Sequence, residues 1–209
     1  MTRPSSTILK ARAIAQRQRW PSRMVRTEAD AQAVLDGGCR FDKQAAQHVH
    51  DFFTGFLHHS AGEWAGRPFA LLPWQWTQLI QPLFGWQRPD GTRRYRRSGV
   101  WIPKKNGKTT LASGICMYLL VADGEPGAQV FSAANDKSQA GMIYRDCAAM
   151  VRQSSDLSAV LELVDSRKLI NYPAQNAYYE ALSADVPTKE GLNISGLVVD
   201  ELYAITDRL

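Results

Sequence analysis

The sequence predicts an α/β protein in which a mostly parallel sheet is flanked by helices and preceded by a helical N-terminal region. Three observations predict this class: short apolar runs of strand length recur in the second half of the chain, segments with helical spacing alternate with them, and turn residues separate the two. Alternation of strands and helices favours parallel pairing, because a parallel connection needs a crossover that is usually helical. The 209 residues are 44% hydrophobic and 22% charged, which argues against wholesale disorder and against a fibrous repeat.

The first 61 residues are expected to be helical wherever they are ordered. Residues 1–26 form a basic arm that permits a weak helix before Trp20-Pro21 interrupts it, and the sequence leaves the order of this arm open. In residues 27–61, apolar side chains recur at helical spacing from Glu28 onward, and Gly37-Gly38 divides the run into two helices. All four histidines fall here, but neighbours on a helix diverge and no cysteine lies close, so solvated histidines are favoured over a zinc site.

Residues 62–209 carry the alternating pattern of an α/β domain. A short helix is expected over Trp74–Phe84, a polar turn over Gly85–Arg97 and a buried strand over Ser98–Ile102. A helix should begin after the next loop, with one apolar stripe formed by Leu111, Ile115, Tyr118, Leu119 and Ala122.

The same alternation continues toward the C-terminal end. Gln129–Ala133 is predicted to be a strand, and Asp136 can cap a helix that runs to about Gln153. Lys168–Tyr172 and Ala177–Leu182 resemble a hairpin, and Gly196–Val199 is a short apolar strand. The expected packing residues of the capped helix are Met142, Cys147, Met150 and Val151.

Composition limits where the protein works. No apolar stretch approaches the roughly 18 residues of a membrane span, so no membrane association is expected. The three cysteines are odd in number and widely spaced, and the N-terminal residues show no signal-peptide pattern. We therefore expect a cytoplasmic protein without a disulfide framework.

The positive charge is concentrated in two basic islands. Residues 1–26 hold seven Lys or Arg and no acid, and residues 88–108 hold eight against Asp90 alone. The rest of the chain is acidic, so these islands are placed to meet phosphate, although solvated surface runs would look the same.

A loop with the composition of a phosphate-binding turn follows the predicted strand Ser98–Ile102. The loop is Pro103-Lys104-Lys105-Asn106-Gly107-Lys108-Thr109-Thr110, and a helix is expected to begin within it. Backbone N–H groups, the helix dipole and one ammonium would then meet at one point. Lys108 would reach the β and γ phosphates of a nucleotide and Thr109 would complete a Mg²⁺ shell. The strict P-loop pattern fails, because Ile102 stands where it requires glycine, and an ordinary basic turn remains the alternative.

A pair of acids follows the last predicted strand. Asp200 and Glu201 come directly after Gly196–Val199, 92 and 93 residues after Lys108. A magnesium nucleotide site needs one carboxylate for the ion and a base to orient the attacking water, and this pair can supply both. An isolated pair at a strand end would ordinarily be a solvated terminus. Combined with the loop, the pair predicts ATP hydrolysis.

An ordered set of motifs resembles one known family. The motifs are Gly62-Glu63-Trp64-Ala65-Gly66-Arg67-Pro68-Phe69, Leu72-Pro73-Trp74-Gln75, the Pro103–Thr109 loop, Ser132-Ala133-Ala134-Asn135 with Gln139-Ala140, Gly191-Leu192-Asn193, and Gly196 to Leu202. Over residues 40–207 the chain resembles the large subunit of tailed-phage terminase, the ATPase that drives viral DNA into a capsid. The resemblance implies a P-loop NTPase of the additional-strand, catalytic-glutamate type, and it explains the missing glycine through that family's deviant P-loop.

Site residues follow from the resemblance position by position. It implies that Gln75 recognises adenine, that Lys108 and Thr109 bind phosphate and Mg²⁺, that Asp200 is the Walker B acid and that Glu201 is the catalytic glutamate. Loop residues Pro103 to Thr110 would bind ATP. Lys104 stands where the family commonly has an arginine that contacts the γ phosphate, and lysine lacks the bidentate fork of that arginine. From the residues alone, Gln75 could instead be a helix-cap or surface amide.

The resemblance also implies partners and raises a question of completeness. It implies double-stranded DNA, a small terminase subunit, a portal protein and a homo-oligomeric ring, in the host cytoplasm, with ATP and Mg²⁺ as cofactors. The chain ends nine residues after Asp200, so a nuclease domain and the last strands of the sheet are absent from this sequence. We expect a fragment, an interrupted reading frame or an excised piece, whose own activity is an open question.

Two other functions fit parts of the pattern. A superfamily 1 or 2 helicase also has an upstream glutamine and an Asp-Glu pair, although Leu202-Tyr203 does not complete a helicase tetrad. A non-catalytic remnant could bind nucleotide or DNA without turnover.

A cluster of arginines precedes the loop and suggests a contact with DNA. Arg93, Arg94, Arg96 and Arg97 would be costly to bury together, so most are expected at the surface. They could grip the phosphates of a duplex, or form a solvated turn.

Overall fold

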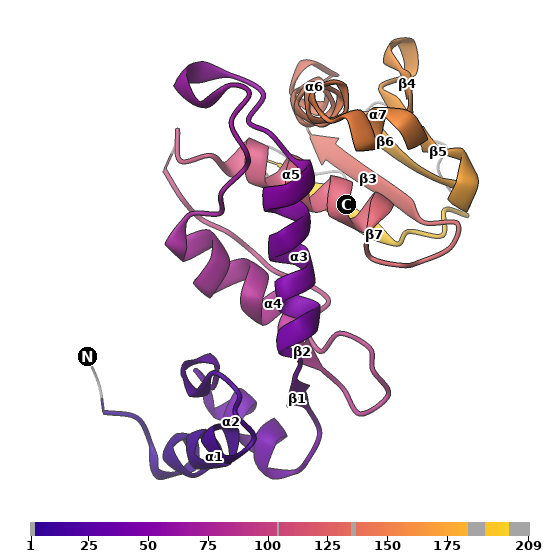
Figure 1. Cartoon of the computed structure of the whole chain (residues 1–209). Helices are drawn as coiled ribbons and strands as arrows, with labels where there is room; N and C mark the ends of the chain where they lie inside the picture. Colours follow the sequence, from indigo (N-terminus) through magenta and orange to yellow (C-terminus); the bar gives the residue numbers. More distant parts are fainter. Residues whose placement is uncertain (1–2, 104, 135–136, 184–190, 201–209) are drawn as a thin grey trace, which may run out of the picture. The chain divides into compact units, whose positions relative to one another are not determined.

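The computed structural model describes residues 3–103, 105–134, 137–183 and 191–200 (Figure 1). The chain divides into two compact units, and each is described by itself. The first contains Met1–Asp51 and Leu71–Trp101, and the second contains Phe52–Ala70 and Ile102–Leu209.

Helices and a two-stranded ribbon build the first unit. Its helices are α1 (Ser6–Arg17), α2 (Glu28–Leu35) and α4 (Gln81–Gly85), and α3 (Lys43–Phe56) begins in it. The two helices expected on either side of Gly37-Gly38 are confirmed as α2 and α3. The helix expected over Trp74–Phe84 is confirmed in kind, but Gln75–Ile80 is π-helical. Strands β1 (Arg40–Phe41) and β2 (Trp86–Gln87) pair antiparallel and were not foreseen.

The basic arm contributes to the core of the first unit. Helix α1 is capped by Ser5, whose hydroxyl accepts from the Ile8 N–H, and it buries Ile8, Ala11 and Ala15. These side chains join a cluster that includes Met24, Val25, Phe41 and Trp86. The structure thus has an ordered helix where the sequence leaves the order of the arm open.

A five-stranded sheet forms the centre of the second unit. Its strands are β3 (Gln129–Ala134), β4 (Glu162–Val164), β5 (Leu169–Tyr172), β6 (Ala177–Ser183) and β7 (Gly196–Val199), in the order β4-β5-β6-β3-β7. Strand β3 pairs parallel with both β6 and β7, whereas β5 runs antiparallel to β4 and β6. The predicted mostly parallel α/β fold is therefore confirmed, with one reversed strand.

The reversed strand arises from the predicted hairpin. A 3₁₀ turn at Pro173–Gln175 connects β5 to β6, and Asn176 closes it with a left-handed φ of 51°. Asparagine tolerates this conformation better than most residues, because its short polar side chain can compensate locally.

Helices α5 (Lys108–Val121), α6 (Lys137–Gln153) and α7 (Ser155–Val160) complete the second unit. The expected single apolar stripe on α5 is wrong, because the buried residues surround the helix: Leu111, Ser113, Gly114, Cys116, Met117, Tyr118 and Leu120. Phe53 packs against the face of α5 that bears Gly114, since a Cβ on Gly114 would lie 2.5 Å from the Phe53 ring. Helix α5 is therefore a central element, packed between Phe53 on one side and α6 and β3 on others.

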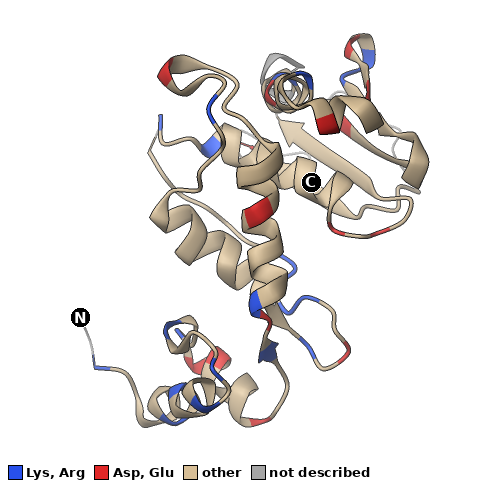
Figure 2. Cartoon of the chain, viewed as in Figure 1, with Lys and Arg blue, Asp and Glu red and all other residues tan. Residues whose placement is uncertain are grey.

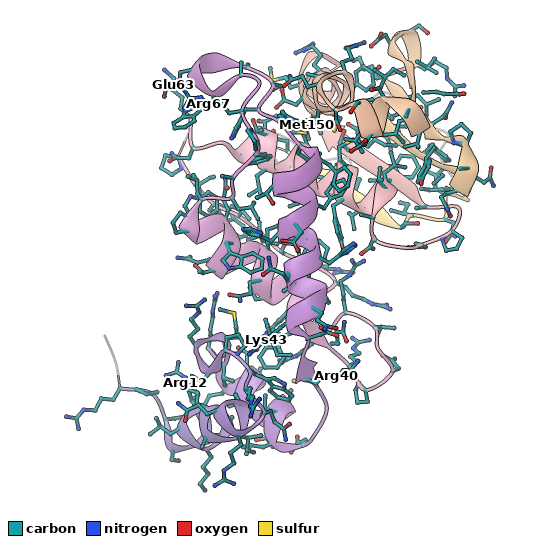
Figure 3. All side chains as sticks on the ribbon, in the orientation of Figure 1. Arg12, Arg40, Lys43, Glu63, Arg67 and Met150 are labelled. Carbon is teal, nitrogen blue, oxygen red and sulfur yellow. The ribbon has the colours of Figure 1, made fainter. Side chains whose placement is uncertain are left out.

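Two further expectations are corrected. Ser98–Ile102 is not a strand, and Trp101 is 87% exposed. A strand needs a partner with which its backbone groups can pair, and among the described strands none pairs with residues 98–102. On α6, Cys147, Met150 (labelled in Figure 3) and Val151 are buried as expected, but Met142 is 45% exposed.

Among the described residues, no helix combines the length and apolar character that a bilayer crossing requires.

Candidate nucleotide-binding site

The loop before α5 has the backbone geometry of an anion-binding turn. Gly107 is the N-cap of α5 with a left-handed φ of 73°, and its carbonyl accepts from the Leu111 N–H at 3.0 Å. The Asn106 side-chain amide donates to the Pro103 carbonyl at 3.2 Å, which closes the loop. Lys105 also has a positive φ, 65°, a conformation that is uncommon outside glycine and recurs at functional turns.

The start of α5 offers its N–H groups to a ligand. Among the described residues, no side chain caps this helix. A helix of 14 residues carries partial positive charge at its N-terminus, where the first N–H groups have no partner within the helix. Such an end accommodates phosphate.

Strand β7 brings Asp200 to this helix end. The Asp200 N–H donates to the Ala133 carbonyl at 3.1 Å, so the β3–β7 pairing fixes its backbone. One carboxylate oxygen lies 2.7 Å from Lys108 Nζ, and the other accepts from the Thr109 hydroxyl at 3.4 Å. The Asp200 side chain is 15% exposed and that of Lys108 is 37% exposed. Residues 92 positions apart therefore form one cluster, as the sequence predicts.

The cluster contains the donor types that a magnesium nucleotide needs. Mg²⁺ prefers hard oxygen ligands, and a threonine hydroxyl beside a carboxylate supplies them. The ammonium of Lys108 and the N–H groups of the helix end complement phosphate charge. The residues present thus fit Mg²⁺ and a polyphosphate. The described residues contain no group of three or more His, Cys, Asp or Glu side chains able to hold a metal ion.

A second carboxylate contacts the same helix end and was missed by sequence reasoning. Asp146 on α6 accepts from Thr110 Oγ1 at 3.3 Å and from Ser60 Oγ at 2.8 Å. The sequence offered only a weak signal for Asp146: it is an acidic residue that directly precedes Cys147 and Ala148, which are both buried.

The other predicted loop residues are placed as follows. Pro103, Lys105, Asn106 and Gly107 are exposed, as residues that meet a ligand would be. Lys104 and Glu201 lie outside the described residues, so their predicted roles stay predictions.

Gln75 belongs to the first unit. Its side chain is only 2% exposed, and its carbonyl oxygen accepts from the Leu72 N–H at 2.8 Å. It therefore closes the turn before the π-helical segment Gln75–Ile80, a type of segment frequent at functional sites. The surface-amide alternative is wrong, and the contact with Leu72 matches the capping alternative. Recognition of adenine stays a prediction.

The four predicted DNA-binding arginines divide into two groups. Arg96 and Arg97 are exposed, as expected. Arg94 pairs with buried Asp30 at 3.1 Å and donates to the Ala29 carbonyl at 3.0 Å, so its head group is held inside the first unit. The Arg93 guanidinium lies over the Phe84 ring, 5.3 Å from its centre. The Arg94 guanidinium lies 5.9 Å from the centre of the Trp86 ring and 5.1 Å from that of Tyr95. The guanidinium of Arg94 is therefore engaged within the first unit, and DNA binding by these arginines stays a prediction.

Asp30 is the centre of that internal cluster. Burial alone raises the pKa of Asp30, but hydrogen bonds from the Tyr95 hydroxyl and from the Thr27 and Arg26 N–H groups outweigh it and hold the pKa below its usual value. The same burial, together with the hydrogen bond to Asp30, raises the pKa of Tyr95 to about 12. The cluster fixes the segment before the nucleotide loop to helix α2.

Comparison with known proteins identifies the family of this chain. The family model described as terminase large subunit, ATPase domain, matches residues 73–209. Among solved structures, the crystal structure of the HK97 bacteriophage large terminase is similar, with a TM-score of 0.63 and 28% sequence identity. That match covers 75% of this chain and 31% of the HK97 chain, so this chain spans about a third of the length of its structural relative. No curated protein matches. The match over residues 73–209 contains the loop, Lys108 and Asp200, and the chain therefore belongs to the terminase large subunit ATPase domain family.

Proposed function

We propose that this chain is the ATP-hydrolysing part of a motor that packages viral double-stranded DNA. The observation that carries the proposal is the cluster at the start of α5, where Lys108 and Thr109 contact Asp200 at 2.7 and 3.4 Å. The family assignment favours a terminase over the helicase alternative, because the matched region contains both halves of this cluster.

Each residue of the cluster has a role in the proposal. Lys108 exchanges Asp200 for the β and γ phosphates when nucleotide binds, because a triphosphate offers more negative charge than one carboxylate. Thr109 and Asp200 would hold Mg²⁺, which supplies positive charge to the phosphates when it is bound. The loop residues from Pro103 to Thr110 bind the phosphates through their backbone N–H groups, which Pro103 alone lacks.

Three roles extend beyond the described cluster. Glu201 acts as the base that orients the attacking water, and Lys104 contributes positive charge near the γ phosphate. Gln75 recognises adenine through its amide, which can donate and accept on the base edge. Support for these three comes from the motif positions they occupy in the sequence.

The proposal includes the partners of a packaging motor. They are double-stranded DNA, a small terminase subunit, a portal protein and further copies of the chain in a ring, in the host cytoplasm. The HK97 relative is named as a bacteriophage large terminase, which supports a phage origin for these partners.

The first unit is the better candidate for the DNA contact. Its segments Met1–Asp51 and Leu71–Trp101 hold 14 Lys or Arg against six acids. Figure 2 shows basic residues along its helices and along the turn after β2. Exposed Arg96 and Arg97 carry charge that phosphates can reach, whereas Arg94 is engaged with Asp30. Lys and Arg facing solvent can release counterions from DNA, which gives binding without sequence preference.

Calorimetric titration of the chain with Mg·ATP, followed by a steady-state assay of phosphate release with and without duplex DNA, tests the proposal. We expect micromolar binding and turnover that DNA stimulates. Binding without turnover would favour the non-catalytic remnant, and the absence of binding would refute the nucleotide site.

A further inference from the structure

Two consecutive threonines at the start of α5 contact different carboxylates. Thr109 donates to Asp200 at the end of β7, and Thr110 donates to Asp146 on α6 at 3.3 Å. The first turn of the helix is therefore held between an acid from the sheet and an acid from the neighbouring helix. Only the first contact belongs to the nucleotide cluster described above.

Helix α6 also contacts α5 one turn further along, at Ser113. Ser113 is fully buried, and its hydroxyl lies 2.9 Å from the Thr109 carbonyl and 3.3 Å from the Ile143 carbonyl. Cys147 donates its thiol to the Ser113 carbonyl at 3.6 Å. One turn separates Thr110 from Ser113 on α5, as one turn separates Ile143 from Asp146 on α6. These polar contacts form a seam within an otherwise apolar interface, so they fix the register of the two helices.

The second oxygen of Asp146 extends the seam to a loop. Ser60 Oγ donates to it at 2.8 Å. Ser60 lies in the segment His58–Pro68, here named the Ser60 loop, which bears Glu63 and Arg67 (labelled in Figure 3). Backbone bonds close this loop: the His59 N–H donates to the Arg67 carbonyl, and the Gly66 N–H donates to the His59 carbonyl, both at 2.9 Å. These two bonds tie the start of the loop to its end.

We infer that Asp146 is a positioning residue that couples the nucleotide site to the Ser60 loop. The inference rests on the proposed ATPase function. Asp146 fixes the rotation of the first turn of α5 through Thr110, and this sets the direction of the adjacent Thr109 hydroxyl, which donates to Asp200 where the two residues would hold Mg²⁺. Displacements of about 1 Å at such a ligand cost large factors in rate. A change in the position of Thr109, on exchanging its contact with Asp200 for a shared ligand, would pass through Thr110 and Asp146 to Ser60.

The positioning half of the inference is tested with Thr110→Val. This change keeps the shape of the side chain and removes the hydroxyl, so the buried surroundings of α5 stay filled. We expect kcat for ATP hydrolysis to fall roughly tenfold and KM to change less than threefold, because Lys108 and the loop N–H groups still bind phosphate. Asp146→Ala should have an effect of the same size, and the double variant should be no worse than either single one. Asp156→Asn, an exposed acid on α7, is the matched control and should leave both constants unchanged.

The coupling half is tested with Ser60→Ala, which removes only the contact with the loop. Hydrogen exchange of residues 58–68 is measured with and without Mg·ATP. The parent should show slower exchange in this loop on binding, and Ser60→Ala should lose that difference while its kcat stays within twofold of the parent.

The outcomes separate this inference from the proposed function. A parent that binds no Mg·ATP would overturn both. A parent that binds and hydrolyses ATP, with Thr110→Val at full kcat, would overturn the positioning role alone. Equal loop protection in the parent and in Ser60→Ala would overturn the coupling.

Discussion

Lys108 Nζ lies 2.7 Å from Asp200 Oδ1, so the lysine that would bind phosphate is paired with the acid that would bind Mg²⁺. The pair neutralises two charges at a helix end that would otherwise be strongly electropositive. In the proposed function both partners would exchange at once, because Asp200 would hold Mg²⁺ and Lys108 would bind the phosphates. The contact therefore defines a resting arrangement of the site, from which the first predictions follow.

Lys108→Ala should weaken ATP binding by roughly 10- to 100-fold, because a charge-assisted contact to phosphate is lost. Isothermal titration with Mg·ATP measures the change. Lys43→Ala, an exposed lysine of the first unit, is the control and should bind like the parent. Unchanged affinity in the Lys108 variant would remove the loop from the nucleotide site.

Asp200→Asn should have opposite effects on the two forms of the nucleotide. Mg·ATP should bind roughly tenfold more weakly, because an amide is a poorer ligand for Mg²⁺ than a carboxylate. ATP in the presence of a chelator should bind more tightly than to the parent, since Lys108 no longer has to leave an acid. Titrations with and without Mg²⁺ measure both, and parallel changes in the two series would contradict the resting arrangement.

Glu201→Gln should leave Mg·ATP binding within threefold of the parent and lower hydrolysis by roughly 10² or more, because the amide keeps the shape of the side chain but cannot act as a base. The comparison needs a titration and a phosphate-release assay on one preparation. Equal losses of binding and turnover would instead mark Glu201 as a structural residue.

The Asp30 cluster should make the stability of the first unit depend on pH. The pKa of Asp30 is lowered in the folded chain, so its contribution is complete above the ordinary aspartate pKa of about 3.9 and is lost as pH falls through the folded value. Arg94→Ala should cost about 2 kcal/mol of unfolding free energy at pH 7, because a buried carboxylate loses a charged partner. Urea unfolding across a pH series from 7 down through the acid range tests this, with Arg96→Ala within about 0.5 kcal/mol of the parent as the control. A cost of Arg94→Ala that stays constant over the whole series would exclude the charge of Asp30 as the cause.

Arg96→Ala combined with Arg97→Ala should lower the slope of log affinity against log salt for duplex DNA by about 2, with little dependence on sequence. The variant with lysine at both positions retains the charge and should keep the slope of the parent. Filter binding or fluorescence anisotropy across a salt series measures the slopes. A slope in the alanine variant equal to that of the parent would leave these arginines without a part in DNA binding.

Local sequence was sufficient for several elements of the fold and of the site. The glycine pair separated α2 from α3, Pro173 to Asn176 closed the β5–β6 hairpin, and the apolar run at Gly196 formed β7. Helix α5 begins at Lys108, directly after Gly107, because glycine adopts the left-handed conformation of this N-cap without strain. Neighbouring residues determine such features, so a pattern in the chain is enough to locate them.

Contacts between distant residues decided the rest. The run Ser98–Ile102 has the composition of a strand, yet a strand forms only where another strand pairs with it, and none of the described strands does so. Arg94 resembles its exposed neighbours until Asp30, 64 positions earlier, gives it a buried partner. Asp146 has no motif at all, and it acquires significance only because α6 brings it to Thr110 and Ser60. The sequence by itself determined the family, the loop and the acid that faces it, Asp200, because a motif of contiguous residues identifies each of them. The tertiary structure decided which charged side chains are paired within the fold and which face a ligand, because burial and pairing depend on residues that only folding brings together.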